Sequence, residues 1–118
     1  MDSELLKDKI YAKLNEKKAI DLEIIDLAQK SSLADYFVVA SGASRIQVKA
    51  LADDIVELCS KEFELEPKKI SGFSEGRWVL MDYGNVVVHL FHPEERDHYK
   101  LEQLWQERPI SEFIDPEN

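Results

Sequence analysis

The sequence contains a single cysteine, Cys59, among its 118 residues. One thiol cannot form a disulfide within the chain, which is typical of proteins in a reducing cytoplasm. No apolar run approaches the roughly 20 residues that a membrane helix needs. Residues 1–4 have neither the apolar region of a signal peptide nor the arginines of a transit peptide. We therefore expect a cytoplasmic protein that does not associate with membranes.

The chain also has few cationic side chains: it contains 15 Lys and Arg and 24 Asp and Glu, which gives a formal net charge of −9. Nucleic acids are bound through cations that displace counterions from phosphates, so this balance disfavours direct binding to phosphates, those of DNA included. It favours a basic partner, since opposite fields speed association. The alternative is that the acidity only keeps the chain soluble, and composition leaves both possibilities open.

Signals for catalysis and metal binding are also weak. The histidines and Cys59 do not follow the ligand spacing of a zinc site, so we expect neither a metal nor a cofactor. The Ser41–Ser44 turn has one glycine and no lysine, which fits a tight turn with a helix cap better than a phosphate-binding loop. A nucleotidyltransferase would need paired strand carboxylates for Mg²⁺, and Asp82 stands alone. A non-enzymatic protein is favoured. The competing hypothesis is a nucleotidyltransferase-type enzyme built around Gly42, Ser44 and Asp82.

Periodicity predicts an α/β protein in which helices flank a mixed β-sheet of about five strands, in the order α-β-β-α-β-β-β-α. Leu6, Ile10 and Leu14 mark a first helix capped by Ser3, and Ser44 with Gln47 forms a capping box for the second. The expected helices span residues 3–17, 44–62 and 94–106, and the expected strands span residues 20–27, 36–40, 69–72 and the two arms of a hairpin, 76–83 and 86–91. Residues 1–107 are expected to form one domain, and residues 108–118 a loosely structured tail.

The hairpin organises the chain, because Gly84-Asn85 suits a two-residue loop. With that loop, Val79 faces Leu90, Leu80 faces His89 and side chains alternate between two faces. One face suits a core and carries Val79, Met81, Tyr83, Val86, Val88 and Leu90. The other combines Trp78, Leu80, Val87 and Phe91 with Asp82 and His89. Either a helix covers this second face, or Trp78 is partly exposed and anchors another protein.

The sequence resembles the Iojap family of ribosomal silencing factors over about residues 6–105. The resemblance lies in Trp78-Val-Leu-Met-Asp-Tyr-Gly-Asn-Val-Val-Val-His-Leu-Phe91, followed by Tyr99, Leu101-Glu102 and Leu104-Trp105, and upstream in Asp35-Tyr-Phe-Val-Val39, Gly42, Ser44 and Gln47-Val48. It implies a nucleotidyltransferase-like fold without the catalytic carboxylates. It also implies binding to the fourteenth protein of the large ribosomal subunit, steric block of subunit joining under nutrient limitation, and a homodimer when free.

The resemblance also suggests how the charges are used, since an acidic protein would be repelled by bare ribosomal RNA but attracted to a basic ribosomal protein. From Pro93 onward the chain has a net charge of −5. The expected anchor is Trp78, with Glu75, Asp82 and Glu95 as acidic contacts. Tyr83, His89 and Arg96 are expected to shape the surface around them.

Overall fold

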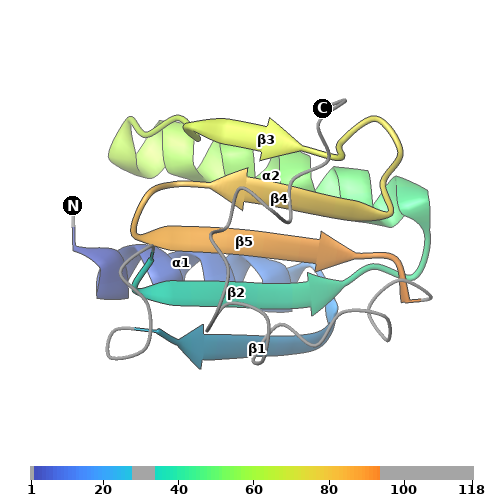
Figure 1. The fold of residues 1–118 in the computed structure, drawn as a ribbon, viewed down its shortest axis with the longest axis horizontal. Coiled ribbons are helices and arrows are strands. Elements are labelled where there is room, and N and C mark those ends of the chain that lie inside the picture. The colour runs from blue at the N-terminus through green and yellow to red at the C-terminus, as the bar shows by residue number, and fades with distance from the viewer. Residues whose placement is uncertain (1, 28–33, 94–118) are drawn as a thin grey trace.

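A computed structural model describes residues 2–27 and 34–93 as two helices on one side of a five-stranded sheet (Figure 1). The elements in chain order are α1 (Ser3–Glu16), β1 (Ile20–Asp26), β2 (Tyr36–Ser41), α2 (Arg45–Phe63), β3 (Lys69–Ser71), β4 (Trp78–Asp82) and β5 (Val86–Phe91). The predicted order is confirmed up to the seventh element. The helix expected over residues 94–106 and the tail at 108–118 lie outside the described residues.

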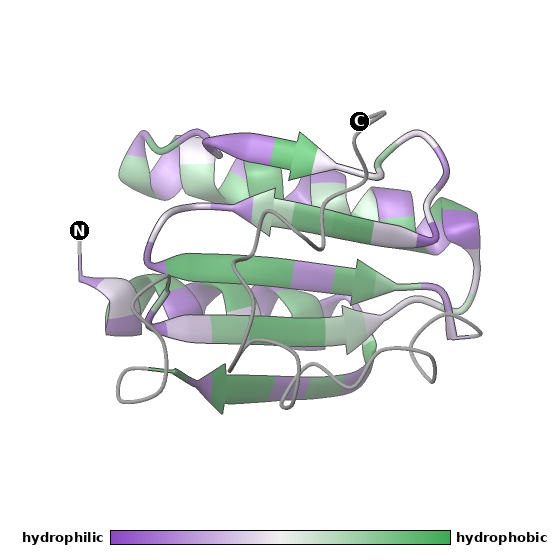
Figure 2. Ribbon diagram, viewed as in Figure 1, coloured by the Kyte–Doolittle hydropathy of each residue, from purple (hydrophilic) through white to green (hydrophobic). Residues whose placement is uncertain are grey.

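The strand order β1-β2-β5-β4-β3 makes a mixed sheet. β2 and β5 pair in parallel at its centre, and the other three pairings are antiparallel. The parallel pair is possible because α2, β3 and β4 separate the two strands in sequence. Figure 2 shows the central strands as nearly continuous hydrophobic ribbons, as expected for strands covered on both faces, with one polar interruption in β5 at His89.

The hairpin register is confirmed: Trp78 pairs with Phe91, Leu80 with His89 and Asp82 with Val87. The loop closes with a hydrogen bond from the Tyr83 N–H to the Val86 carbonyl at 3.0 Å. Gly84 has a φ of 91°, and the Asp82 carboxylate accepts a hydrogen bond from its N–H at 2.8 Å. Of the two loop residues, only the first, Gly84, has a positive φ, which is the pattern of a type II′ turn. The backbone twist of such turns matches that of the antiparallel strands they join.

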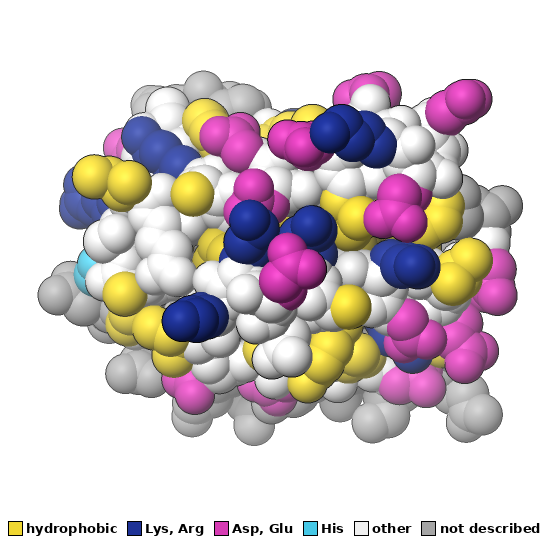
Figure 3. All heavy atoms as spheres, turned by 180° about the vertical axis from the view of Figure 1, so that it is seen from behind, with side chains coloured by type: hydrophobic (Ala, Val, Ile, Leu, Met, Phe, Trp, Pro, Cys, Tyr) yellow, Lys and Arg dark blue, Asp and Glu magenta, His cyan; other side chains and the backbone are white. Residues whose placement is uncertain are grey.

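The face of the sheet that the sequence assigns to the core packs against both helices. Leu6, Ile10 and Leu14 of α1 are buried there. The α2 and sheet residues of this core are Val48, Leu51, Ala52, Ile55, Leu58, Cys59, Val38, Ala40, Val79, Met81, Tyr83, Val86, Val88 and Leu90. From behind, the solvent-facing side of the helix layer carries interspersed acidic and basic side chains (Figure 3).

Local details at the helix ends differ in part from expectation. Asp2, not Ser3, caps α1 by accepting a hydrogen bond from the Glu4 N–H at 3.0 Å, while the Ser3 hydroxyl donates to the Asp35 carboxylate at 2.9 Å. The Ser44 cap of α2 is confirmed, with its Oγ accepting from the Gln47 N–H at 3.1 Å. No helix in the described part of the chain is long and apolar enough to cross a membrane.

Candidate functional site

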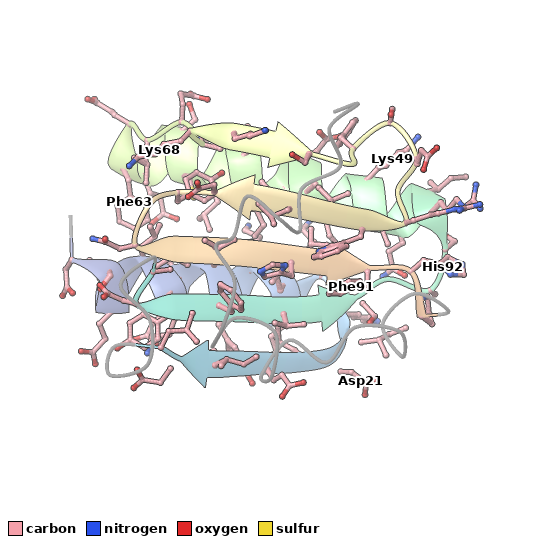
Figure 4. The ribbon with its side chains drawn as sticks, viewed as in Figure 1. Asp21, Lys49, Phe63, Lys68, Phe91 and His92 are labelled. Carbon is pink, nitrogen blue, oxygen red and sulfur yellow. The ribbon has the colours of Figure 1, made fainter. Side chains whose placement is uncertain are left out.

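The second face of the sheet holds a cluster of rings from β2, β4 and β5: Phe37, Trp78, His89 and Phe91. The Trp78 and Phe91 rings stack with centroids 5.2 Å apart, and the Phe37 and His89 rings lie 4.4 Å apart. Phe37, His89 and Phe91 are fully buried, whereas Trp78 is only partly buried. Figure 4 shows Phe91 on this face, near the end of β5 that continues to His92. Trp78 is therefore the ring through which the cluster reaches the surface.

His89 holds the indole of Trp78 in place. Trp78 Nε1–H donates a hydrogen bond to His89 Nδ1 at 3.1 Å. Burial lowers the pKa of His89 to about 3, so the imidazole is neutral at physiological pH. Because Nδ1 accepts, the single ring proton lies on Nε2. No described residue accepts a hydrogen bond from Nε2. Leaving a buried donor unpaired costs about 1–3 kcal/mol, so this His is not an optimal residue for stability alone.

The buried neutral His89 predicts that acid destabilises the fold. The unfolded chain binds a proton at this residue with the ordinary pKa of 6.5, while the folded chain resists protonation down to about pH 3. Stability is therefore complete above pH 6.5 and falls as pH decreases toward 3, by about 1.4 kcal/mol per pH unit once the unfolded residue is charged. Urea unfolding should show a loss of about 2 kcal/mol from this residue between pH 7.5 and pH 5.

The matched control for this prediction is His89→Gln, whose amide oxygen keeps an acceptor for the Trp78 indole and does not titrate. Its stability should fall by about 2 kcal/mol less over the same pH interval. An imidazole NMR titration of the parent gives a second measurement. An NMR pKa near 6.5 for His89, or equal pH dependence in both proteins, would contradict the buried neutral assignment.

The backbone geometry of the loop before β4, residues 72–77, sets the position of Trp78. Gly72 has a φ of 78°, and a Cβ at this position would lie 2.0 Å from the Trp78 carbonyl oxygen. The loop then closes on itself, with the Gly76 N–H donating to the Gly72 carbonyl at 3.0 Å. The glycine at position 72 therefore permits the close approach that sets the start of β4. Sequence reasoning missed this contact because the two residues are six positions apart in a loop without periodicity.

The predicted site residues do not all gather at one place. Glu75 is exposed in the β3–β4 loop, three residues before Trp78 in the sequence. Asp82 lies at the other end of β4, about 13 Å away along the strand. It is partly buried, and its carboxylate is engaged with the hairpin loop. Glu95 and Arg96 lie outside the described residues.

Tyr83 and His89 are not surface groups in the structure. Tyr83 is 6% exposed and belongs to the core beneath the helices, beside Cys59. Burial raises the pKa of the Tyr83 phenol, and it raises the pKa of the Cys59 thiol to about 11, so both stay protonated and unreactive. Neither Tyr83 nor His89 is placed to touch a partner directly, and any effect of these residues would act through their neighbours.

The competing enzyme site is not assembled. Phe91 pairs with Ser41, so Gly42 and Ser44 follow one end of the parallel strand pair, whereas Asp82 pairs with Val87 at the opposite end. A Cβ on Gly42 would lie 2.9 Å from Val48, so close packing accounts for this glycine. Ser44 is engaged in capping α2. Among residues 2–27 and 34–93, no group of three or more potential ligands gathers to hold a metal ion.

The match to known proteins spans the whole chain. The family model described as "Ribosomal silencing factor during starvation" matches residues 1–118. The chain belongs to the family of ribosomal silencing factors. A family member from Bacillus subtilis, "Ribosomal silencing factor RsfS", is 43% identical over 102 residues, covering 86% of each chain. The family consists of silencing factors rather than enzymes, which confirms the non-enzymatic assignment.

Two further relatives extend the comparison. The ribosomal silencing factor RsfS of Halalkalibacterium halodurans is 38% identical over 112 residues, covering 95% of this chain and 94% of that one. A crystal structure of a Chromobacterium violaceum protein superposes with a TM-score of 0.82 at 34% identity, covering 92% of this chain and 89% of that one. The fold described above is therefore shared with an experimentally solved relative.

Proposed function

We propose that this protein binds the large ribosomal subunit through its fourteenth protein and sterically blocks association with the small subunit, repressing translation under nutrient limitation. Membership of the ribosomal silencing factors supports the general role. The observation that carries the docking site is Trp78, a partly exposed indole fixed on an otherwise buried aromatic cluster. Rigid, partly exposed Trp side chains are common anchors at protein interfaces, because they bury a large apolar area at low entropic cost.

The acidic groups assigned to the proposed docking surface are Glu75, Asp82 and Glu95, and Arg96 is assigned to the same surface. Glu75 is exposed in the loop that leads into Trp78, so it can pair with a basic residue at the rim of the interface. Asp82 has one carboxylate oxygen engaged with Gly84 and retains capacity on the other. His89 and Tyr83 are positioning residues in this proposal. The first holds the Trp78 indole, and the second supports the β4–β5 turn from the core.

Several further properties belong to the same proposal. The protein acts in the cytoplasm and forms a homodimer when it is not bound to the subunit. Residues 1–107 form its folded domain and residues 108–118 a tail. The fold is related to that of nucleotidyltransferases without retaining their catalytic carboxylates. The net charge of −9 supports the choice of a basic ribosomal protein as partner.

Sedimentation with purified subunits tests the assignment of the partner. The protein is expected to co-sediment with large subunits and not with small subunits. Binding should weaken as salt rises, since opposite charges at an exposed interface are screened. Competition by the isolated fourteenth protein should release the factor from the subunit. Co-sedimentation with small subunits alone, or no effect of that competitor, would contradict the proposed partner.

A further inference from the structure

The first turn of α2 and the loop between β3 and β4 meet at the same end of the sheet as Trp78. Gly76, with a φ of 69°, lies so close to α2 that a Cβ there would be 2.9 Å from the Arg45 carbonyl oxygen and 3.3 Å from Lys49 Cε. The loop is also tied to β5, because the His92 N–H donates to the Arg77 carbonyl at 2.8 Å. Side chains from two distant segments are thus held together by backbone packing. Figure 4 places Lys49 and His92 at this end.

We call the resulting surface the basic end and define it as Arg45, Ile46, Lys49, Phe73 and Arg77. Ile46 is 81% exposed and Phe73 is 37% exposed, which makes them two of the few large hydrophobic residues at the described surface. Arg45 and Arg77 are exposed, and Lys49 is partly so. Seen from behind, basic and hydrophobic side chains lie together at the left edge of the molecule (Figure 3).

The three cations of the basic end form no ion pair within the described part of the chain, unlike Lys9, Lys13 and Lys61 on the helices. Arg45 and Lys49 are four residues apart on α2, a spacing at which like charges destabilise a helix by a few tenths of a kcal/mol. The first turn of α2 has no acidic side chain to offset them. Glu75 is the one acid in the adjoining loop, residues 72–77.

We propose that the basic end contacts the phosphate backbone of RNA on the large subunit, next to the site where Trp78 engages protein. This inference rests on the proposed function, because it places the RNA beside the ribosomal protein that the factor binds. Arg77 directly precedes Trp78 at the start of β4, so the basic end and the indole lie at the same end of the sheet. Screening limits electrostatic reach to about 8 Å in physiological salt, so the local cations act on nearby phosphates despite the acidic net charge.

The composition of the basic end favours RNA over an acidic peptide. The guanidinium groups of Arg45 and Arg77 match phosphate oxygens in a two-pronged geometry. An exposed phenyl ring such as that of Phe73 provides a stacking surface for an unpaired base, which is the usual mode of contact with non-helical RNA. The net charge of −9 should keep the affinity for free RNA low, so the contact operates when Trp78 has already docked.

The test compares two triple variants of the full chain. One changes Arg45, Lys49 and Arg77 to Gln, and its matched control changes Lys9, Lys13 and Lys61 to Gln. Both alter net charge equally, so any difference reports position rather than total charge. Binding is measured against whole large subunits over a range of KCl concentrations, and against the isolated fourteenth protein without RNA. Circular dichroism checks that both variants remain folded.

The first variant should bind large subunits about tenfold more weakly, and the slope of log affinity against log salt should fall by about 2–3, as expected for two to three lost phosphate contacts. Its binding to the isolated protein should equal that of the parent, and the control variant should retain the slope. An unchanged slope, or an equal loss of affinity for the RNA-free protein, would overturn the RNA contact. The second of these results would show instead that the cations bind an acidic protein segment. Failure of the parent itself to bind large subunits would refute the proposed function and this inference with it.

Discussion

Replacing Trp78 by alanine is expected to reduce affinity for the large subunit by at least about 30-fold, while the domain stays folded. A Trp anchor at the centre of an interface commonly contributes 2 kcal/mol or more, which corresponds to that factor. The indole is the partly exposed member of the ring cluster, so its removal takes away the apolar group that a partner would bury. Co-sedimentation with purified large subunits measures the effect.

The same substitution should also reduce stability, because Trp78 stacks on Phe91 and donates to His89. A control must therefore separate lost docking from lost folding. Val87→Ala serves, since Val87 lies on the same face of the sheet, is fully buried and cannot touch a partner. It should lower the free energy of unfolding by about 1–3 kcal/mol and leave binding unchanged.

Unaltered binding by a folded Trp78→Ala protein would remove Trp78 from the interface. Equal loss of binding in Trp78→Ala and Val87→Ala would indicate that destabilisation, not docking, is responsible. Urea unfolding of both variants shows which case applies. A third variant, Trp78→Phe, keeps a ring on the surface but loses the indole N–H, so it should bind better than the alanine variant.

Replacing Gly72 by alanine is expected to destabilise the fold by about 3 kcal/mol or more. Its φ of 78° is unfavourable for any residue with a Cβ, and the added carbon would lie 2.0 Å from the Trp78 carbonyl oxygen. Neither atom can move as a flexible side-chain end would, because the oxygen belongs to the backbone of β4 and the added carbon is bonded directly to the backbone of residue 72, just after β3. Thermal or urea unfolding measures the loss.

Gly84→Ala is the matched control, because Gly84 also has positive φ, at 91°, but the nearest atom to its Cβ would be the mobile Lys68 Nζ at 3.2 Å. We expect a cost of about 1–2 kcal/mol there, from backbone conformation alone. Similar losses for both variants would mean that the approach of Gly72 to Trp78 is not a constraint. In that case the position of the indole would have to be set elsewhere.

The regular features of the fold could be predicted because they repeat along the chain. Alternation in the hairpin and the Gly84-Asn85 loop gave the correct register and assigned Val79 and Leu90 to the core face. The spacing of apolar residues located both helices within a residue or two. A one-residue shift of register would move the apolar side chains of a strand from the core to the other face. The alternation of apolar residues along the strand is therefore sufficient to predict its register.

The features that the sequence did not predict depend on contacts between residues that are distant in the chain. Ser3 was the expected cap of α1, but its hydroxyl bonds to Asp35, which leaves the cap to Asp2. Asp21 adopts a φ of 49° within an irregular β1 pairing, although the sequence alternates cleanly there.

The sequence likewise did not reveal the contacts that build the candidate site. The Trp78–His89 hydrogen bond joins residues on paired strands, and the basic end brings the start of α2 against the β3–β4 loop. No local motif marks either arrangement. Both became visible only when the sheet placed the segments side by side.

The most direct test of the central claim is light scattering from purified large and small subunits mixed after the large subunits have been incubated with saturating protein. Formation of joined ribosomes should fall as the protein concentration rises, and the Trp78→Ala variant should require at least about 30-fold more protein for the same effect. Incubating the protein with the small subunits as well, before mixing, should not increase the inhibition of joining. Full subunit joining with the factor shown to be bound to the large subunit would contradict the steric block.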